Sequence, residues 1–410
     1  MAAAAHPATT DTYRARAAYE STGPLASYLF RLMSIKQTNL CVSADVETSA
    51  ELLALAEEVG DSICIFKTHC DIVTDWSDRT ARELTEISQR KFFIVFEDRK
   101  FADIGETVQK QYTSGYHRIA YWSQITNAHV LPGPAIVTAL HQAADVTIAK
   151  LNTGVYTNIS SNPRPRKIHG VAGIEEEDDV EDDDDDDDEK ITKDKEDQAE
   201  QDAKDNDVAL ATPPANEEFE ERKLAAQPKD RKHSVVSVST TISFRHESIS
   251  PRPDPEFSND EAFIVSKDTM LKRLETVPIL RQLLLLAEMS SEGHLMTPEY
   301  QQKTVEIARA NSQFVMGFIA QRSLNTEKSD NFITMTPGCK LPPPGQEGQK
   351  LGDGLGQQYN TPRKLILDQG CDVIIVGRGI FRAPDRTAEA ERYRLEGWKA
   401  YMERVGTNHR

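Results

Sequence analysis

Two acidic residues and a lysine stand within six residues of one another in the stretch FEDRKFADIGETV, which runs from Phe96 to Val108. Asp98, Lys100 and Asp103 follow the apolar run KFFIVF, which is typical of a buried strand. A lysine that neighbouring aspartates keep charged can stabilise a developing negative charge and then protonate it. The spacing therefore predicts acid–base or electrostatic chemistry at the end of a strand.

A repeated pattern along the chain supplies the elements that must position these charges. Each unit is a short apolar, β-branched run that ends in polar residues and is followed by a longer helical stretch, such as 49–60 or 298–310. Continuous apolar strands alternating with helices indicate a parallel sheet covered by helices. Eight units predict an α/β fold, a (β/α)₈ TIM barrel with its active site at the carboxyl ends of the strands. The predicted strands are 39–46, 63–69, 92–100, 125–130, 283–290, 314–321, 332–338 and 372–379.

Polar residues recur where the first five predicted strands end. Each of them alone is compatible with a surface residue at the start of a loop, and Lys67 and Lys100 with solvated lysines. Asp103 and Glu106 also have the spacing of a capping box at a helix start. The recurrence on successive strands favours function. The strand-end residues are Ser43, Asp45, Lys67, His69, Asp98, Lys100, Asn127, His129, Glu288 and Ser290.

The last strand predicts a phosphate site. The run VIIVGRG places Gly377, Arg378 and Gly379 where barrel enzymes often bind phosphate, through backbone N–H groups and a forked guanidinium. A glycine turn with an exposed arginine is the simpler alternative. The preceding Gly/Pro-rich loop, 340–359, is too long for a plain connection and predicts a mobile lid over the same site.

The acidity of the chain belongs to one segment. Residues 151–270 carry 15 Lys and Arg against 32 Asp and Glu, a net charge of −17, whereas the whole chain has −18. Such a segment has too little apolar area to offset its ordering entropy. We therefore predict an N-terminal extension (1–26), the first half of the barrel (27–145), a disordered acidic insertion between strands 4 and 5 (146–271) and the second half of the barrel (272–410).

The remaining composition indicates a cytoplasmic protein. The five cysteines stand in or beside apolar runs and form no CxxC pair, which favours reduced thiols packed in a core. No apolar run is long enough to span a membrane, and the N-terminus has no apolar signal core. Its Ala/Arg character leaves a transit peptide as a weaker alternative.

Taken together, seven short motifs resemble orotidine 5′-phosphate decarboxylases of the fungal type, from about Ser27 to Arg404. The resemblance implies cofactor-free decarboxylation of orotidine 5′-phosphate to uridine 5′-monophosphate in pyrimidine biosynthesis, by a homodimer that binds neither nucleic acid nor membrane. The absence of metal-ligand spacing and of a dinucleotide fingerprint agrees with cofactor-free catalysis. The motifs are LCVSADV, FKTH, FEDRKFADIG, LAEMS, MTPG, LGQQY and IIVGRG.

The resemblance also implies roles for individual residues. Lys67, Asp98, Lys100 and Asp103 match an alternating charged array in which Lys100 is the proton donor. The substrate contacts that it implies are Asp45, Lys67 and Thr107 for the ribose, Ser290 and Gln357 for the pyrimidine, Gln357, Tyr359, Gly377 and Arg378 for the phosphate, and Pro337 in the pocket wall. Ser43, at the end of the first strand, is a further predicted substrate-binding residue. Asp103 and Thr107 would reach the neighbouring subunit's site.

Two other functions stay open at this point. A sister barrel enzyme could use the same Asp-x-Lys-x-x-Asp frame for aldol or epimerase chemistry on a sugar phosphate, with magnesium. The acidic insertion could instead make the chain an interaction protein for basic partners. Ser234, preceded by Arg231 and Lys232, and Ser250, followed by Pro251, are candidate phosphorylation sites within an otherwise solvated spacer.

Overall fold

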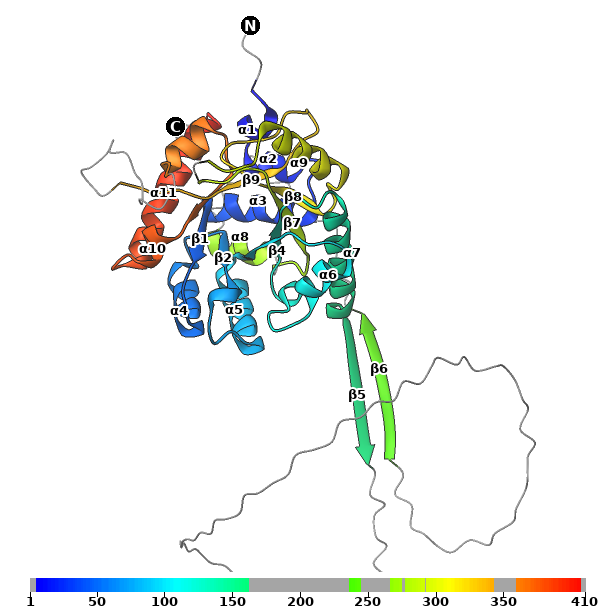
Figure 1. The fold of residues 1–410 in the computed structure, drawn as a ribbon. Coiled ribbons are helices and arrows are strands. Elements are labelled where there is room, and N and C mark those ends of the chain that lie inside the picture. The colour runs from blue at the N-terminus through cyan, green and yellow to red at the C-terminus, as the bar shows by residue number, and fades with distance from the viewer. Residues whose placement is uncertain are drawn as a thin grey trace, which may run out of the picture. The chain divides into compact units, whose positions relative to one another are not determined.

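Parallel strands form a closed barrel with helices around it (Figure 1). The structure is a computed structural model that describes residues 5–161, 236–244, 266–274, 277–291, 293–342 and 359–406. The strand order around the barrel is β1-β10-β9-β8-β7-β4-β3-β2, which confirms the predicted (β/α)₈ fold. The barrel strands are β1 (Leu40–Ala44), β2 (Ile65–Thr68), β3 (Ile94–Phe101), β4 (Ile125–Ala128), β7 (Gln282–Leu286), β8 (Val315–Ile319), β9 (Ile333–Thr336) and β10 (Val373–Val376).

Each predicted strand coincides with a barrel strand, with ends that differ by a few residues. The strands are buried along nearly their whole length, as expected for a parallel sheet that is filled inside and covered outside. Residues that alternate along a strand point alternately into the barrel and toward the helices. Polar groups just beyond the apolar core therefore gather at the carboxyl ends of the strands.

Helices surround the barrel and begin at ordinary caps. Thr48, Ser77 and Thr297 accept hydrogen bonds from the first-turn N–H groups of α4, α5 and α9. The predicted helices 49–60 and 298–310 are confirmed as α4 and α9. The α-helices are α1 (Pro7–Thr10), α2 (Tyr13–Ala17), α3 (Pro24–Lys36), α4 (Ser49–Val59), α5 (Asp78–Lys91), α6 (Gly105–Thr113), α7 (Ala135–Leu151), α8 (Lys267–Arg273), α9 (Pro298–Ala310), α10 (Arg378–Phe381) and α11 (Arg386–Arg404). Short 3₁₀ turns, Cys70–Ile72 and Ile119–Tyr121, and a π-helical turn, Lys364–Asp368, complete the connections.

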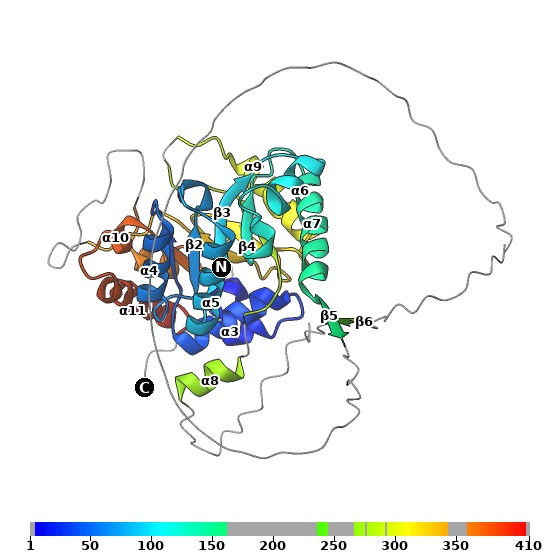
Figure 2. The same cartoon turned by 90° about the horizontal axis from the view of Figure 1, so that it is seen from below.

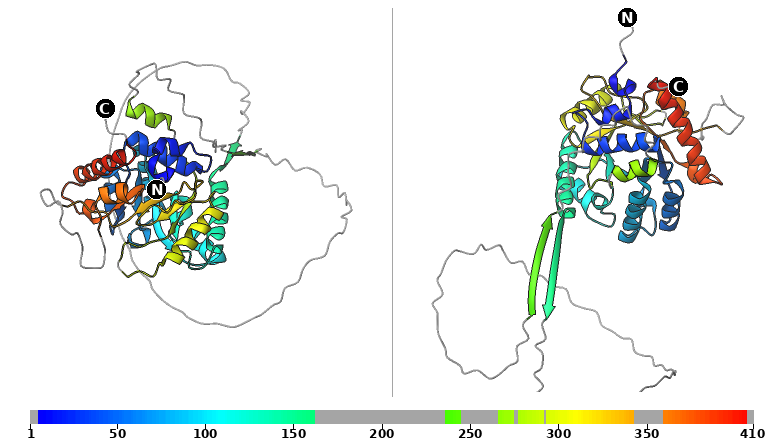
Figure 3. Two further views of the ribbon diagram at one scale, coloured as in Figure 1. Left: turned by 90° about the horizontal axis from the view of Figure 1, so that it is seen from above. Right: turned by 180° about the vertical axis from the view of Figure 1, so that it is seen from behind.

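The first helices pack against the end of the barrel opposite the predicted site, although the sequence suggested an extension there. The N-terminal helices, drawn in blue, lie next to α11, drawn in red (Figure 3). Tyr13 stacks on Tyr401 of α11, with ring centroids 4.0 Å apart. Arg16 is fully buried and donates to Asp372 at the start of β10, at 2.5 Å, and to Asn331, at 2.7 Å. Residues 5–26 thus belong to the folded body of the barrel.

The chain leaves the barrel after α7, which continues to Leu151, and returns at α8, which packs on α3 (Figure 2). Between them, β5 (Thr153–Ser161) and β6 (Val236–Phe244) form a two-stranded sheet. The rest of the predicted insertion, with Ser234 and Ser250, lies outside the described residues.

The five cysteines are all buried thiols, as predicted, and no disulfide joins them. Among the helices that the structure describes, none has the length and apolar character needed to cross a membrane.

Candidate active site

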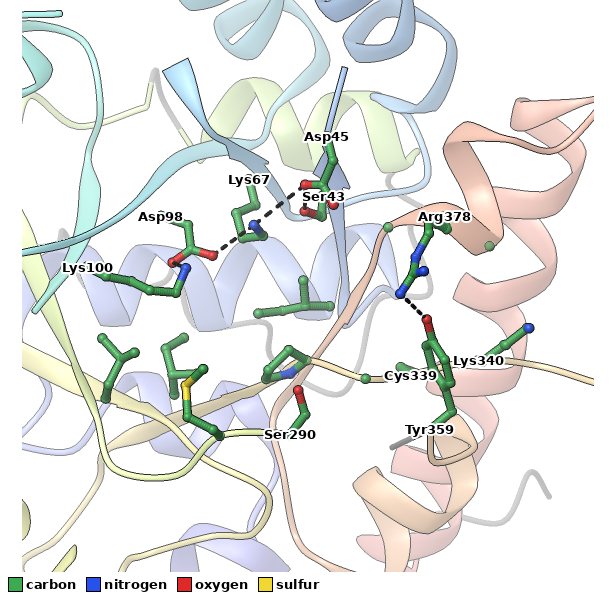
Figure 4. A pocket seen from close by; sticks show the side chains of 18 of the residues that line it. Ser43, Asp45, Lys67, Asp98, Lys100, Ser290, Cys339, Lys340, Tyr359 and Arg378 are labelled. Atoms are coloured by element: carbon green, nitrogen blue, oxygen red, sulfur yellow. Dashed lines mark hydrogen bonds and ion pairs between the residues drawn. The ribbon is translucent and has the colours of Figure 1, made fainter. Parts of the chain in front are cut away.

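A cavity of about 480 Å³ opens at the carboxyl ends of the barrel strands. Its two chemically distinct walls are an ion-pair cluster from β1, β2 and β3, and a tyrosine–arginine pair from the last connection and α10 (Figure 4). The predicted site residues that line it are Ser43, Asp45, Lys67, Asp98, Lys100, Ser290, Pro337, Tyr359, Gly377 and Arg378. The structure therefore brings these residues together around one cavity.

Asp98 is the centre of the ion-pair cluster. Its Oδ2 accepts a hydrogen bond from the Lys67 ammonium at 2.9 Å, and its Oδ1 accepts one from the Lys100 ammonium at 2.6 Å. The Lys67 side chain is 6% exposed and that of Asp98 13%, whereas that of Lys100 is 34% exposed. One carboxylate thus bridges two ammonium groups that both line the cavity, and Lys100 is the more exposed of the two.

The two lysines fix the protonation state of Asp98. Burial alone would raise the pKa of Asp98, but the charges of Lys67 and Lys100 hold it well below its ordinary value. Burial alone would lower the pKa of Lys67, and the carboxylates of Asp98 and Asp45 raise it instead. The Asp98–Lys67 pair therefore stays charged across the physiological pH range.

Asp45 and Ser43 extend the cluster along β1. The Ser43 hydroxyl donates to Asp45 Oδ1 at 2.5 Å, and the same oxygen lies 3.9 Å from the Lys67 ammonium. The Asp45 side chain is 42% exposed and can accept hydrogen bonds from a ligand in the cavity. Alternating acids and lysines on neighbouring strands thus present both donors and acceptors to the same space.

The backbone at Lys100 is unusual. Lys100 has φ +54°, a left-handed conformation that is uncommon for residues other than glycine. The β3–β4 pairing shifts register between Glu97 and Phe101, so Lys100 stands at an irregularity that re-aims its side chain. Asn127 of β4 accepts a hydrogen bond from the Lys100 N–H and donates one to Asp98 Oδ1, each at 2.7 Å.

His69 and Asn127 were noted in the sequence only as strand-end residues, with no assigned role. The structure places His69 Nε2 2.7 Å from the Lys67 ammonium and 3.4 Å from Asp98 Oδ2. Burial and the charge of Lys67 lower the pKa of His69. The alternation of inward residues along β2 and β4 was the signal that could have assigned both to the cluster.

The opposite wall is built from the last connection and the start of α10. Arg378 Nη2 donates to the Tyr359 hydroxyl at 2.6 Å, and the Lys340 ammonium lies 5.3 Å from the centre of the Tyr359 ring. A Cβ added at Gly377 would lie 3.4 Å from Asp45 Oδ2, so glycine lets the backbone approach the cluster closely. Lys340 and Arg382, which the sequence prediction missed, also line the cavity and add positive charge to this wall.

Apolar side chains, which have no distinctive sequence signal, close the space between the two walls. Leu286, Met289, Ile319 and Ile375 line the cavity together with Pro337 and Ser290. A flat, partly apolar group such as a heterocyclic base fits such a lining, with the Ser290 hydroxyl as a polar contact.

Two predicted site residues that the structure describes do not line this cavity. Asp103 and Thr107 are absent from its lining, and Gln357 lies outside the described residues. The capping-box alternative for Asp103 is wrong, because α6 is capped by Ile104 without a side-chain hydrogen bond. Asp103 instead accepts from the N–H of Ile104 at 2.8 Å and from Gln111 at 3.2 Å.

The sequence matches the family model of the orotidine 5′-phosphate decarboxylase / HUMPS family over residues 38–238 and 262–393. A protein of Hypocrea atroviridis named orotidine 5′-phosphate decarboxylase is 41% identical over 411 residues, which cover 98% of this chain and 99% of the relative. One of the same name from Aureobasidium pullulans is 40% identical, with 97% of this chain and 95% of the relative covered.

Solved structures of two orotidine 5′-monophosphate decarboxylases are also similar to the chain. The Leishmania donovani orotidine 5′-monophosphate decarboxylase gives a TM-score of 0.42 at 13% identity, and covers 92% of this chain and 98% of its own. The Methanocaldococcus jannaschii enzyme gives 0.39 at 14% identity, with 87% and 98% covered. Family membership rests on the sequence similarity.

Proposed function

The chain belongs to the orotidine 5′-phosphate decarboxylase / HUMPS family and is a carboxy-lyase of pyrimidine biosynthesis, and we propose that Lys100 is the proton donor when orotidine 5′-phosphate loses carbon dioxide. The observation that carries this proposal is the Asp98 carboxylate that bridges the Lys67 and Lys100 ammonium groups at the barrel rim. The product is uridine 5′-monophosphate, and the chain uses no cofactor.

The reaction creates negative charge at one carbon atom. When the bond to the carboxylate breaks, its electron pair stays on the pyrimidine carbon, in an orbital that the ring system does not delocalise. A preorganised ammonium group stabilises this carbanion electrostatically and then transfers a proton to it. Lys100 is left as a neutral amine and regains its proton from water, so the cycle closes without a further reactant.

Asp98 has two functions in this scheme. It keeps Lys100 charged and aimed, because its Oδ1 accepts from the ammonium at 2.6 Å. Its negative charge also lies close to the place of the substrate carboxylate, so it disfavours the bound substrate relative to the transition state, in which that carboxylate leaves as neutral carbon dioxide. Lys67 balances Asp98 and keeps the buried carboxylate from taking up a proton.

The remaining cavity residues bind the parts of the substrate that do not react. Asp45 and Lys67 hold the ribose hydroxyls, with Ser43 supporting Asp45, and Ser290 contacts the pyrimidine while Pro337 lines its pocket. Tyr359, Gly377 and Arg378 hold the phosphate, and we assign Gln357 to the pyrimidine and the phosphate from the family resemblance. Binding energy from these distant groups is used to order the reacting centre.

We propose further that two copies of the chain form the working unit, in which Asp103 and Thr107 enter the site of the neighbouring copy. Neither residue lines the cavity of its own chain. Beside them, Ile104 is 54% exposed, and Leu131, which follows β4, is 74% exposed. Exposed apolar side chains around the ends of neighbouring strands suit a two-fold interface.

The first experiment follows the ultraviolet absorbance of orotidine 5′-phosphate with the intact chain, in the presence of a chelator. We expect turnover to uridine 5′-monophosphate that the chelator does not reduce. A folded protein that leaves orotidine 5′-phosphate intact but acts on a sugar phosphate with magnesium would replace this proposal with the sister chemistry.

The buried, unpaired thiols support a reducing compartment, and we assign the protein to the cytoplasm.

A further inference from the structure

Neighbouring strands β2 and β3 carry two polar pairs on opposite faces. Lys67 and Asp98 point into the barrel and pair at 2.9 Å. Thr68 and Glu97, which are partners in the β2–β3 register, point outward, and the Thr68 hydroxyl donates to Glu97 Oε2 at 2.7 Å. The outer pair therefore lies directly behind the inner pair on the same two strands.

Glu97 is fully buried and surrounded by hydrogen-bond donors. Besides Thr68, the Cys70 N–H lies 3.1 and 3.2 Å from the two carboxylate oxygens, and the Cys70 thiol donates to Oε1 at 3.2 Å. Among the residues that the structure describes, no cation forms an ion pair with Glu97 within 4.0 Å. Burial accordingly raises its pKa to about 7, against the effect of these hydrogen bonds.

A buried carboxylate without a cationic partner costs stability relative to an apolar side chain of similar size. The contacts of Glu97 point to a reason for its presence. Thr68 and Cys70 flank His69, whose imidazole lies 2.7 Å from the Lys67 ammonium and 3.4 Å from Asp98. Glu97 thus binds the two residues on either side of His69, whose imidazole contacts the ion-pair cluster.

We propose that Glu97 is a positioning residue of the active site, which holds the segment Thr68–Cys70 so that His69 and Lys67 keep their places against Asp98. The kinetic part of this inference rests on the proposed decarboxylase function. Glu97 touches no substrate and acts through the loop that it fastens. A displacement of about 1 Å in a reacting array can cost on the order of 10²-fold in rate, so a fastening of this kind bears on catalysis.

The test uses Glu97→Gln, which keeps the shape of the side chain but turns an N–H group toward donors that need an acceptor. Asp330→Asn is the control for the loss of a buried carboxylate, although Asp330, unlike Glu97, also pairs with Arg309 at 2.8 Å. Asp330 is also a buried carboxylate, and it accepts from the N–H groups of Thr326 and Glu327 at 2.8 Å each, but it stands before β9, at the opposite end of the barrel from the site. Thr68→Val, which removes only the donor on β2, serves as a second variant should Glu97→Gln fail to fold.

Each variant is measured in three ways on the full-length protein: kcat and KM for orotidine 5′-phosphate, the thermal midpoint, and the NMR titration of the His69 imidazole, assigned with His69→Gln. We expect Glu97→Gln to lower kcat by about 10- to 100-fold and Asp330→Asn to leave kcat unchanged, at similar losses of thermal midpoint. We also expect the His69 titration to move upward, toward an ordinary value of about 6.5, in Glu97→Gln and in Thr68→Val but not in Asp330→Asn.

A different result would contradict the positioning role of Glu97. If Glu97→Gln and Thr68→Val keep the kcat of the control and leave the His69 titration where it is in the unmodified protein, Glu97 is a structural residue only. The His69 titration is independent of turnover. Should the unmodified protein not decarboxylate orotidine 5′-phosphate, the proposed function fails, and the titration alone decides whether Glu97 positions His69.

Discussion

At the scale of single residues, the site depends on how one carboxylate is shared between two ammonium groups. Asp98 Oδ2 accepts a hydrogen bond from Lys67, and Oδ1 accepts one from Lys100 and one from the Asn127 amide. Both carboxylate oxygens of Asp98 thus accept hydrogen bonds before substrate arrives. Because these groups are already oriented, they do not have to reorganise during the reaction, as water dipoles would.

The pKa of Asp98 leads to a prediction about stability. Because this pKa is lower in the folded protein than in the unfolded chain, where it is about 3.9, the interaction stabilises the folded state above that pH and is lost as the pH falls further. We expect Asp98→Asn to lower the free energy of unfolding by about 3 kcal/mol, constant between pH 5 and 8, with the difference shrinking below pH 4. Urea unfolding of both proteins at each pH measures it, and a difference that changes between pH 5 and 7 would assign the effect to another group.

Sequence patterns predicted most of the residues in this cluster but not the bonds between them. Alternation along a strand places Asp98 and Lys100 on one face, and the spacing alone says no more. That Lys100 turns through a left-handed backbone, and that Asn127 supports it from the next strand, depends on the register of β3 against β4. Register is a property of two strands together, so neither segment reveals it alone.

At the scale of elements, the irregular end of β3 is the feature that most directly serves the site. A non-glycine residue at φ +54° costs conformational energy, and such strain persists only where its surroundings hold it. The hydrogen bond from the Lys100 N–H to Asn127 is the contact that holds it here.

Removal of that support should affect turnover more than substrate binding. We predict that Asn127→Ala lowers kcat by about 10- to 100-fold and changes KM much less, because the ammonium of Lys100 is displaced while the groups assigned to ribose and phosphate remain. Thr126→Val is the control, since Thr126 is equally buried on β4 and its hydroxyl donates to the Glu97 carbonyl rather than to the ion-pair cluster. Steady-state kinetics of both variants decide, and equal losses of kcat would attribute the effect to β4 as a whole.

The helices and strands of the barrel could be predicted from the sequence. Runs such as LLLLAEMS and DVIIVGRG are too apolar and too short for anything but buried strands between helices, and all eight barrel strands occur where predicted. The packing of α1 and α2 against the end of the barrel could not be predicted from the sequence. Its signal is a pairing of Arg16 with Asp372, residues that are remote in the sequence and ordinary in isolation.

At the scale of the whole molecule, we propose that the barrel is the catalytic unit and that the acidic segment is dispensable for it. The chain leaves the barrel after α7 and returns at α8, so the strands close without the intervening residues. Long insertions at such places add little to the cost of loop closure, about 0.6 kcal/mol for each doubling in length.

Deletion tests this division. We predict that replacement of residues 162–235 by a short Gly/Ser linker leaves kcat and KM for orotidine 5′-phosphate unchanged. The excision avoids α7 and α8, which bury Thr147 and Leu271. Steady-state assays of the two proteins at equal concentration provide the measurement. A soluble, folded deletion protein without turnover would show that the segment takes part in catalysis and would favour a function that depends on it.

The dimer proposal has a sharper test in a mixture of two inactive proteins. If Asp103 acts in the neighbouring site, a hybrid of Lys100→Ala and Asp103→Ala chains contains one intact site, with Lys100 from one copy and Asp103 from the other. Equal amounts, dissociated and reassociated, should recover about a quarter of the unmodified activity, as random pairing of a two-fold dimer predicts. A mixture that stays as inactive as its components would place Asp103 and Lys100 in the same chain's site.

The most direct test of the account is the kcat of Lys100→Ala for orotidine 5′-phosphate, measured together with the affinity of the variant for uridine 5′-monophosphate. With the proton donor and its charge removed, we predict a loss of kcat of about 10³-fold or more, while the product still binds within about tenfold of its original affinity. The thermal midpoint confirms that the variant is folded. A variant that binds product and keeps more than about a tenth of the original kcat would contradict the assignment of Lys100 as the proton donor.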